Sequence, residues 1–197
     1  YLKAKLLRSW GRSSSLFQDS ESIENRFNVH LDGIQYDAKF VFEEIGYQLE
    51  PSEISAAFAL VQLEKLNQNI AARQDNFNSH IQFFKTYQEC LVLPKQNPRA
   101  ETGWLAFPMI VKEEAPFTRT DLQIFLEKRN IQTRVVFTGN LLRQPGYKDI
   151  DCIGKADDFV NADNVMRGGI LLALHHGLNP EMINHLYDSC DKFFSQL

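Results

Sequence analysis

The sequence predicts an α/β protein that ends in a small α+β domain, in which a small antiparallel or mixed sheet carries helices on one face and follows a long helix. Three observations predict this fold. Apolar residues recur near helical spacing from residue 51 to about residue 90, without glycine and with no proline after Pro51. Short apolar segments then alternate with helix-start signals. The last such segment, 170–174, is apolar throughout, which is typical of a buried strand.

The region before the long helix has little regular pattern. Residues 1–9 look like the end of a helix, whereas 10–50 are irregular, with turn-forming residues at 10–15 and at Asp32–Gly33. A long surface segment without structure of its own is usually functional or packed on a partner. The chain starts without Met and as if inside a helix, so we expect a piece of a longer protein.

The long helix is expected to span residues 51–90. Pro51 suits its first turn, where a missing N–H does no harm. This length exceeds that of a typical globular helix, so we expect a bend or a role bridging two domains.

The following segments alternate between strand and helix patterns. Residues 104–111 predict a strand, with Pro108 at an edge or bulge. Thr118 and Asp121 form a capping-box pattern before a helix that runs to Asn130. The alternating residues 131–137 predict a second strand.

The C-terminal segments complete the small domain. Residues 138–158 are expected to form a loop or a short helical turn, and a short helix should begin at 161–166. Gly168 and Gly169 then precede the strand 170–174. Asn179 should cap the last helix, with Pro180 at its first position. The stripe expected to be buried consists of Met182, Ile183, Leu186, Cys190, Phe193 and Phe194.

Composition excludes several classes of protein. A net charge of −4 argues against a nucleic-acid or membrane-surface partner, and no apolar run approaches the ~20 residues of a membrane helix. The 3 cysteines are far apart and predict no disulfide framework, no metal site and a reducing compartment. The neighbouring His175 and His176 point to opposite faces of a strand and cannot easily share a metal. His30 and His80 are expected to face solvent.

The most informative stretch is 134–145, which places arginines and an amide around a glycine turn just after a strand. Such a turn can present donors to an anionic or hydroxyl-rich ligand. The alternative is a loop held by structural hydrogen bonds. The candidate binding residues are Arg134, Asn140 and Arg143.

Two further segments resemble a known family. Residues 46–57 (GYQLEPSEISAA), followed by Val61-Gln62-Leu63, and residues 172–178 (LALHHGL) resemble motifs of the DegT/DnrJ/EryC1/StrS aminotransferase family. The stretch 134–145, together with Trp10-Gly11-Arg12, is most similar to the pyridoxal-phosphate (PLP)-dependent nucleotide-sugar 3-dehydratases of that family.

The resemblance implies the C-terminal portion of a fold-type I PLP enzyme. Residues 1–50 would be the tail of the large PLP domain with active-site loops, 51–90 the interdomain helix and 91–197 the small domain. Such enzymes are dimers, and Gln48 stands where the family has an asparagine that reaches the PLP phosphate of the neighbouring subunit. Glu50 stands where a basic residue is frequent, which weakens anion binding by this loop.

The resemblance also implies what the chain should lack. Ser13–Phe17 replaces the cysteine-rich insert that holds an iron–sulfur cluster in some relatives, so no cluster is predicted. The cofactor-carrying lysine of the aminotransferases, and the histidine that replaces it in the dehydratases, would lie before Tyr1. No residue of this chain is therefore predicted to be catalytic, and the chain alone should be inactive.

Three functions remain open from the sequence. The first is 3-dehydration of a nucleotide-linked 4-keto-6-deoxy sugar in polysaccharide or lipopolysaccharide biosynthesis, by a cytoplasmic homodimer. The second is a sugar aminotransferase of the same family. The third, of another class, is a non-catalytic regulatory or scaffold homologue.

Overall fold

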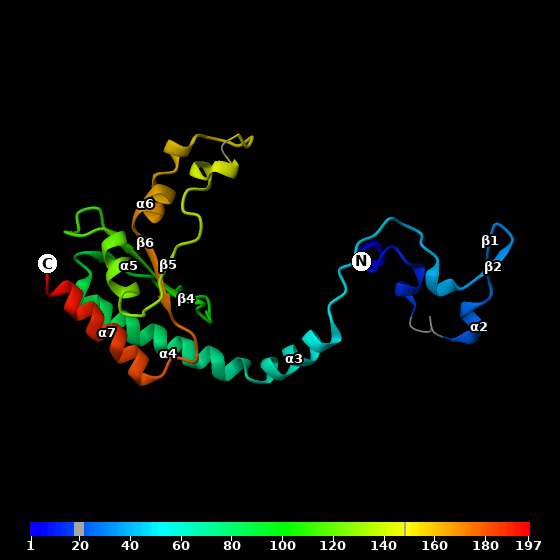
Figure 1. The fold of residues 1–197 in the computed structure, drawn as a ribbon, viewed down its shortest axis with the longest axis horizontal. Coiled ribbons are helices and arrows are strands. Elements are labelled where there is room, and N and C mark those ends of the chain that lie inside the picture. The colour runs from blue at the N-terminus through cyan, green and yellow to red at the C-terminus, as the bar shows by residue number, and fades with distance from the viewer. Residues whose placement is uncertain (18–21, 148) are drawn as a thin grey trace. The chain divides into compact units, whose positions relative to one another are not determined.

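The computed structural model describes residues 1–17, 22–147 and 149–197, which form two compact units, Tyr1–Leu63 and Glu64–Leu197 (Figure 1). The first unit contains helix α1 (Leu2–Arg8), the short helix α2 (Ile23–Arg26) and two 3-10 turns. The expected helix at 1–9 is therefore confirmed.

A β-hairpin corrects the prediction that residues 10–50 are irregular throughout. Strand β1 (Val29–Leu31) pairs antiparallel with β2 (Ile34–Tyr36), and Asp32 and Gly33 form the turn between them. Both turn residues have positive φ, 50° and 83°. Positive φ at both central residues is the backbone that matches the twist of a two-residue hairpin, and Asp-Gly is a preferred sequence for it.

The predicted long helix is two helices. Helix α3 spans Glu53–Glu64 and α4 spans Leu66–Phe84, with the break at Lys65 where the expected bend falls. Pro51 precedes α3 instead of lying in its first turn. The backbone N–H of Ala56 bonds to the carbonyl of Ser52, so Ser52 is the residue just before the helix and Pro51 lies one position earlier. That placement was wrong.

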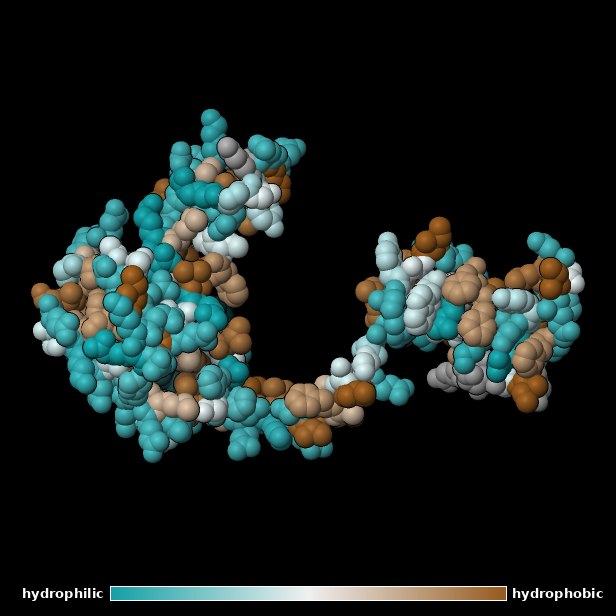
Figure 2. Space-filling model, in the orientation of Figure 1, coloured by the Kyte–Doolittle hydropathy of each residue, from teal (hydrophilic) through white to brown (hydrophobic). Residues whose placement is uncertain are grey.

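Apolar side chains of α3 are exposed, as Figure 2 shows for this helix. Ile54 is 83% exposed, Phe58 69% and Leu63 63%, and α3 has no buried residue. An apolar helix surface of this kind normally packs against another protein surface.

The second unit is built on a four-stranded antiparallel sheet in the order β3-β4-β6-β5. The strands are β3 (Leu91–Val92), β4 (Ala106–Val111), β5 (Arg134–Val135) and β6 (Gly169–Ala173). Its further helices are α5 (Arg119–Glu127), α6 (Val160–Gly168) and α7 (Pro180–Phe194).

The core of the second unit lies on one face of this sheet. Along β4, the buried Phe107, Met109 and Val111 alternate with half-buried residues, as the two-residue period of a strand requires. Apolar residues of α4, α5 and α7 join them in one cluster, so the predicted placement of helices on one face is confirmed. The cluster consists of Phe77, Phe84, Leu91, Phe107, Met109, Val111, Phe117, Leu122, Leu126, Ile170, Leu172, Leu174, Leu186, Cys190 and Phe193.

Local signals placed most elements of this unit correctly. The capping box of Thr118 and Asp121 starts α5, and the Asn179 side chain accepts a bond of 2.8 Å from the Met182 N–H at the start of α7. Pro108 lies beyond the part of β4 that pairs with β3, so it occupies a locally open edge as predicted. Met182 is an exception, since it is 52% exposed instead of buried.

The two short strands differ from expectation. The strand predicted at 131–137 is reduced to Arg134–Val135, because Thr133 turns inward to Glu127 and Phe137 adopts a φ of 45°. Strand β3 was not predicted at all. Two residues carry too little pattern to be recognised in sequence.

His80 corrects the expectation that it faces solvent. It is 0% exposed, and its Nδ1 and Nε2 lie 2.9 Å from the Tyr187 hydroxyl and 3.1 Å from the Ala173 carbonyl. The carbonyl can only accept, so Nε2 carries the proton and Nδ1 accepts from the tyrosine. Burial lowers the pKa of His80 and raises that of Tyr187 to about 12.

The buried neutral His80 predicts acid sensitivity of this unit. Below pH about 6.5, His80 binds a proton in the unfolded chain but stays neutral in the folded chain. The free energy of unfolding should therefore decrease as the pH is lowered, by up to about 1.4 kcal/mol per pH unit. We expect His80→Gln to flatten this dependence and the exposed His176→Gln to leave it unchanged. Urea unfolding followed by Trp104 fluorescence in a Trp10→Phe background, from pH 7.5 to 5, measures it. Equal slopes in all three chains would contradict the assignment.

Candidate functional site

Asn140 and Arg143, two of the predicted site residues, meet at one carboxylate. Arg143 Nε and Nη2 donate to the two oxygens of Asp163, each over 2.6 Å, and Asn140 Nδ2 donates to Asp163 Oδ1 over 2.8 Å. Asp163 lies on α6 and is 6% exposed, and Asn140 is 2% exposed. A two-point guanidinium–carboxylate pair fixes orientation as well as distance.

The electrostatics of this cluster favour the charged pair over a wide pH range. Hydrogen bonds from Arg143 and then Asn140 lower the pKa of Asp163 to about 2, and Asp163 and Asp157 raise that of Arg143. Because the pKa of Asp163 is lowered in the folded chain, the charged carboxylate stabilises the fold at pH values above the ordinary pKa of an aspartate. This stabilisation is lost as the pH falls toward 2. The loop is therefore tied to α6 at every physiological pH.

Further bonds hold the loop from within. Asn140 also donates to the Ala156 carbonyl over 2.9 Å, and its side-chain oxygen accepts from the Leu142 N–H over 3.2 Å. Gly139 has a φ of 60°, and a Cβ there would lie 2.4 Å from the Met166 side chain. Only glycine therefore allows the loop to approach α6 this closely.

Arg134 lies apart from this cluster. It is exposed on β5, where it pairs with Leu171, and its Nη1 donates to the Thr133 carbonyl over 3.1 Å. The side-chain oxygen of Gln132 can accept from the same guanidinium when its amide is turned accordingly. Its hydrogen-bond partners are neutral, and its charge helps to lower the pKa of the Glu127 carboxyl.

Arg143 also has a hydrogen-bond donor that the described residues do not use. Its side chain is 39% exposed, and of its nitrogens Nη1 has no hydrogen-bond partner in the part of the chain that the structure describes. The sequence did not identify Asp163, the residue that organises the loop. A signal was available, because an acidic residue inside a predicted short helix needs a partner when it is buried.

In the first unit, the two predicted active-site motifs lie against each other. The Trp10 N–H donates to the Tyr47 carbonyl over 2.9 Å, and the Tyr47 N–H donates to the Leu7 carbonyl over 2.7 Å. A Cβ on Gly46 would lie 2.2 Å from the Gly11 nitrogen. Trp10-Gly11-Arg12 and Gly46-Tyr47-Gln48 therefore form one packed element.

Gln48 is exposed on this element, and its backbone forms an isolated antiparallel β-bridge with Ser9. Its side-chain oxygen accepts from the Glu50 N–H over 3.3 Å, and its Nε2 has no partner among the described residues. Glu50 accepts hydrogen bonds from Ser9 and from Arg8, which lower its pKa. Arg8 thus offsets the negative charge that Glu50 brings next to Gln48.

The described residues give no metal-ligand group. No set of 3 or more histidine, cysteine or acidic side chains is arranged to hold a metal ion in that part of the chain. The ring of His175 accepts from the Gly177 N–H over 3.1 Å, which is a local turn contact. None of the helices that the structure describes has the length and hydropathy to cross a bilayer.

Comparison with known proteins places this arrangement in a family. The model of the DegT/DnrJ/EryC1/StrS aminotransferase family matches residues 15–190. The lipopolysaccharide biosynthesis protein RfbH of Salmonella typhimurium is 28% identical over 190 residues, which cover 95% of this chain and 43% of that protein. The dTDP-4-dehydro-2,6-dideoxy-D-glucose 3-dehydratase of Saccharopolyspora spinosa is 31% identical over 193 residues, covering 96% and 41%.

The fold agrees with this match. The E coli GDP-4-keto-6-deoxy-D-mannose-3-dehydratase solved with bound hydrated PLP superposes with a TM-score of 0.75 at 22% identity, over 93% of this chain and 45% of that one. The chain therefore belongs to the DegT/DnrJ/EryC1/StrS aminotransferase family and has the fold of part of a fold-type I PLP enzyme. It spans less than half the length of these relatives.

Removal of the Asp163 carboxylate is predicted to loosen the loop. Asp163→Asn places an amide where Arg143 needs an acceptor, so the amides of Leu142, Arg143 and Gln144 should exchange with deuterium about tenfold faster or more. Asp157→Asn is the control, because Asp157 is 88% exposed and binds Arg143 through one oxygen. Hydrogen–deuterium exchange measures both. Equal protection in the two variants would show that Asp163 is not the anchor.

Proposed function

We propose that the chain is part of a PLP-dependent enzyme that removes the C3 hydroxyl of a nucleotide-linked 4-keto-6-deoxy sugar. The observation that carries this proposal is the match along almost the whole chain to a relative named as a 3-dehydratase, at 31% identity. The name of RfbH supports a role in lipopolysaccharide sugar biosynthesis. The proposed enzyme is a cytoplasmic homodimer without an iron–sulfur cluster.

The residues present fit a PLP phosphate at Gln48. Its exposed amide offers Nε2–H donors that have no partner among the described residues, and Arg8 neutralises the neighbouring Glu50. An amide donor next to a neutralised carboxylate suits an anionic oxygen. When bound, PLP supplies an electron sink for the chemistry at the sugar. The role of Gln48 is to hold the phosphate end.

The loop from Arg134 to Arg143 is proposed to hold the substrate. Arg134 and the free Nη1 of Arg143 donate to substrate phosphate or hydroxyl oxygens. The Asn140 amide bonds to Asp163 and Ala156, so we propose that it contributes by shaping the loop that faces the sugar. The catalytic base is expected outside these 197 residues.

A direct assay of the full-length protein separates the three candidate functions. The protein is incubated with PLP, glutamate and a nucleotide-linked 4-keto-6-deoxy sugar, and products are analysed by mass spectrometry and NMR. We expect a sugar that has lost its C3 oxygen. An amino sugar would instead identify an aminotransferase. Failure to bind PLP, seen as no absorbance band of the cofactor, would favour the scaffold.

Arg134 is predicted to act in substrate binding. Arg134→Gln removes the charge and shortens the side chain but keeps a polar amide, so KM for the nucleotide-linked sugar should rise about tenfold or more, with a smaller change in kcat. Arg129→Gln is the matched control, since Arg129 stacks on Phe125 at the end of α5. An unchanged KM for Arg134→Gln would remove Arg134 from the site.

A further inference from the structure

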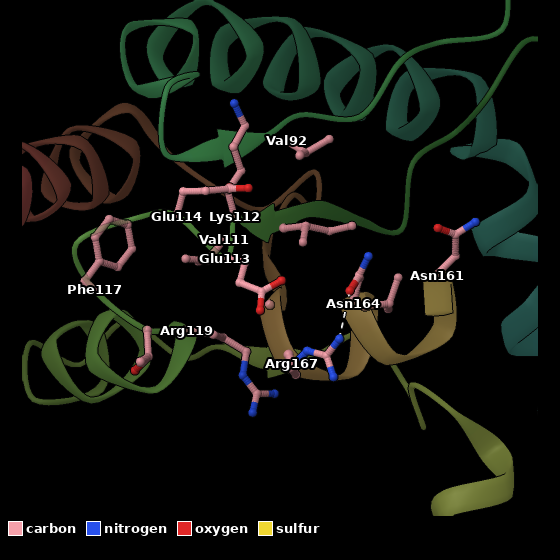
Figure 3. A pocket seen from close by; sticks show the side chains of 14 residues that line it. Val92, Val111, Lys112, Glu113, Glu114, Phe117, Arg119, Asn161, Asn164 and Arg167 are labelled. Atoms are coloured by element: carbon pink, nitrogen blue, oxygen red, sulfur yellow. Dashed lines mark hydrogen bonds between the residues drawn. The ribbon is translucent and has the colours of Figure 1, made fainter. Parts of the chain in front are cut away.

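A hollow lies in the Glu64–Leu197 unit, and none of Asn140, Arg143 and Asp163 lines it. It has a volume of about 570 Å³ and is walled by β3, β4, the start of α5 and one side of α6 (Figure 3). Neither Arg134 nor Arg143 lines it. Its apolar lining consists of Val92, Ile110, Val111, Phe117 and Val165. A hollow of this size and lining is of the kind that holds a small molecule.

Two arginines line this hollow, and neither forms a direct ion pair in the part of the chain that the structure describes, although the charge of Arg167 helps to lower the pKa of Asp163. Arg119 begins α5 and Arg167 lies near the end of α6 (Figure 3). Arg119 Nε is buried and has no hydrogen-bond partner among the described residues. Arg167 Nη2 donates to the Asn164 oxygen over 3.0 Å. Buried donors are normally satisfied, so the guanidinium of Arg119, a residue that lines the hollow, is incompletely satisfied by the described residues.

The other charged lining residues do not supply that acceptor. Glu113 and Glu114 also line the hollow, but in the described chain neither forms an ion pair with Arg119 or Arg167. The Lys112 ammonium donates to the Gln88 carbonyl over 2.8 Å. With 3 cationic and 2 anionic side chains, the lining carries a net positive charge.

We propose that this hollow binds a small organic phosphate, with the phosphate between Arg119 and Arg167 and an apolar body on the Val92–Ile110 floor. One guanidinium group can donate two parallel N–H bonds to two oxygens of a phosphate, whereas a lysine ammonium acts as a point charge. The apolar part of the ligand displaces water from the apolar lining of the hollow. This site is additional to the proposed sugar site, and it does not depend on the proposed function.

Phenyl phosphate is the probe, because it combines one phosphate with one apolar ring. Isothermal titration of the 197-residue chain should show saturable 1:1 binding, with phenol and inorganic phosphate each at least about tenfold weaker. The double variant Arg119→Gln/Arg167→Gln should bind at least about tenfold more weakly. Arg129→Gln removes one arginine charge outside the hollow and should bind as the parent chain does.

Two results would overturn the proposal. One is the lack of saturable binding of phenyl phosphate at millimolar concentration. The other is unchanged affinity in the double variant when its circular dichroism matches that of the parent. If the double variant unfolds, Asn164→Trp replaces it, because a ring at this exposed lining position obstructs the part of the hollow beside Arg167. Binding that survives Asn164→Trp would also contradict the proposal.

Discussion

The two-point pair between Arg143 and Asp163 determines the shape of the candidate site. It joins a loop whose described residues form short 3-10 turns to a regular helix, and Asn140 bonds to the same carboxylate. A buried carboxylate without these partners would be costly, so the loop and α6 stabilise each other. The consequence is a loop held in one conformation, which reduces the entropy lost when a ligand binds.

Close backbone packing fixes where that pair lies relative to the sheet. A Cβ on Gly168 would lie 2.3 Å from the Val111 carbonyl, and one on Gly169 would lie 2.5 Å from the Val165 carbonyl. These two glycines let α6 turn directly into β6. Because β6 pairs with both β4 and β5, this turn connects α6 to the middle of the sheet, and one side of α6 lines the hollow.

Local chemistry made much of this fold predictable. The caps at Thr118 and Asn179 act within a few residues, and both were predicted correctly from sequence. Of the two glycines predicted to precede the strand, Gly169 is instead the first residue of β6. The incorrect or missed predictions mostly concern residues whose partners are far away in the sequence. His80 is buried by Tyr187 and Ala173, and Arg143 finds its carboxylate 20 residues away on α6. The hairpin at Asp32–Gly33 was missed although its turn signal is local.

Arg134 on β5 and Arg143 on the loop that Asp163 holds in place are both proposed to face the substrate. The most direct test is a crystal structure of the full-length protein with PLP and a nucleotide-linked sugar. We expect ligand oxygens within hydrogen-bond distance of Arg134 and of Arg143 Nη1, with the Arg143–Asp163 pair intact. A ligand bound elsewhere, or an Arg143 that leaves Asp163 to bind it, would show that these two arginines do not hold the substrate in the proposed way.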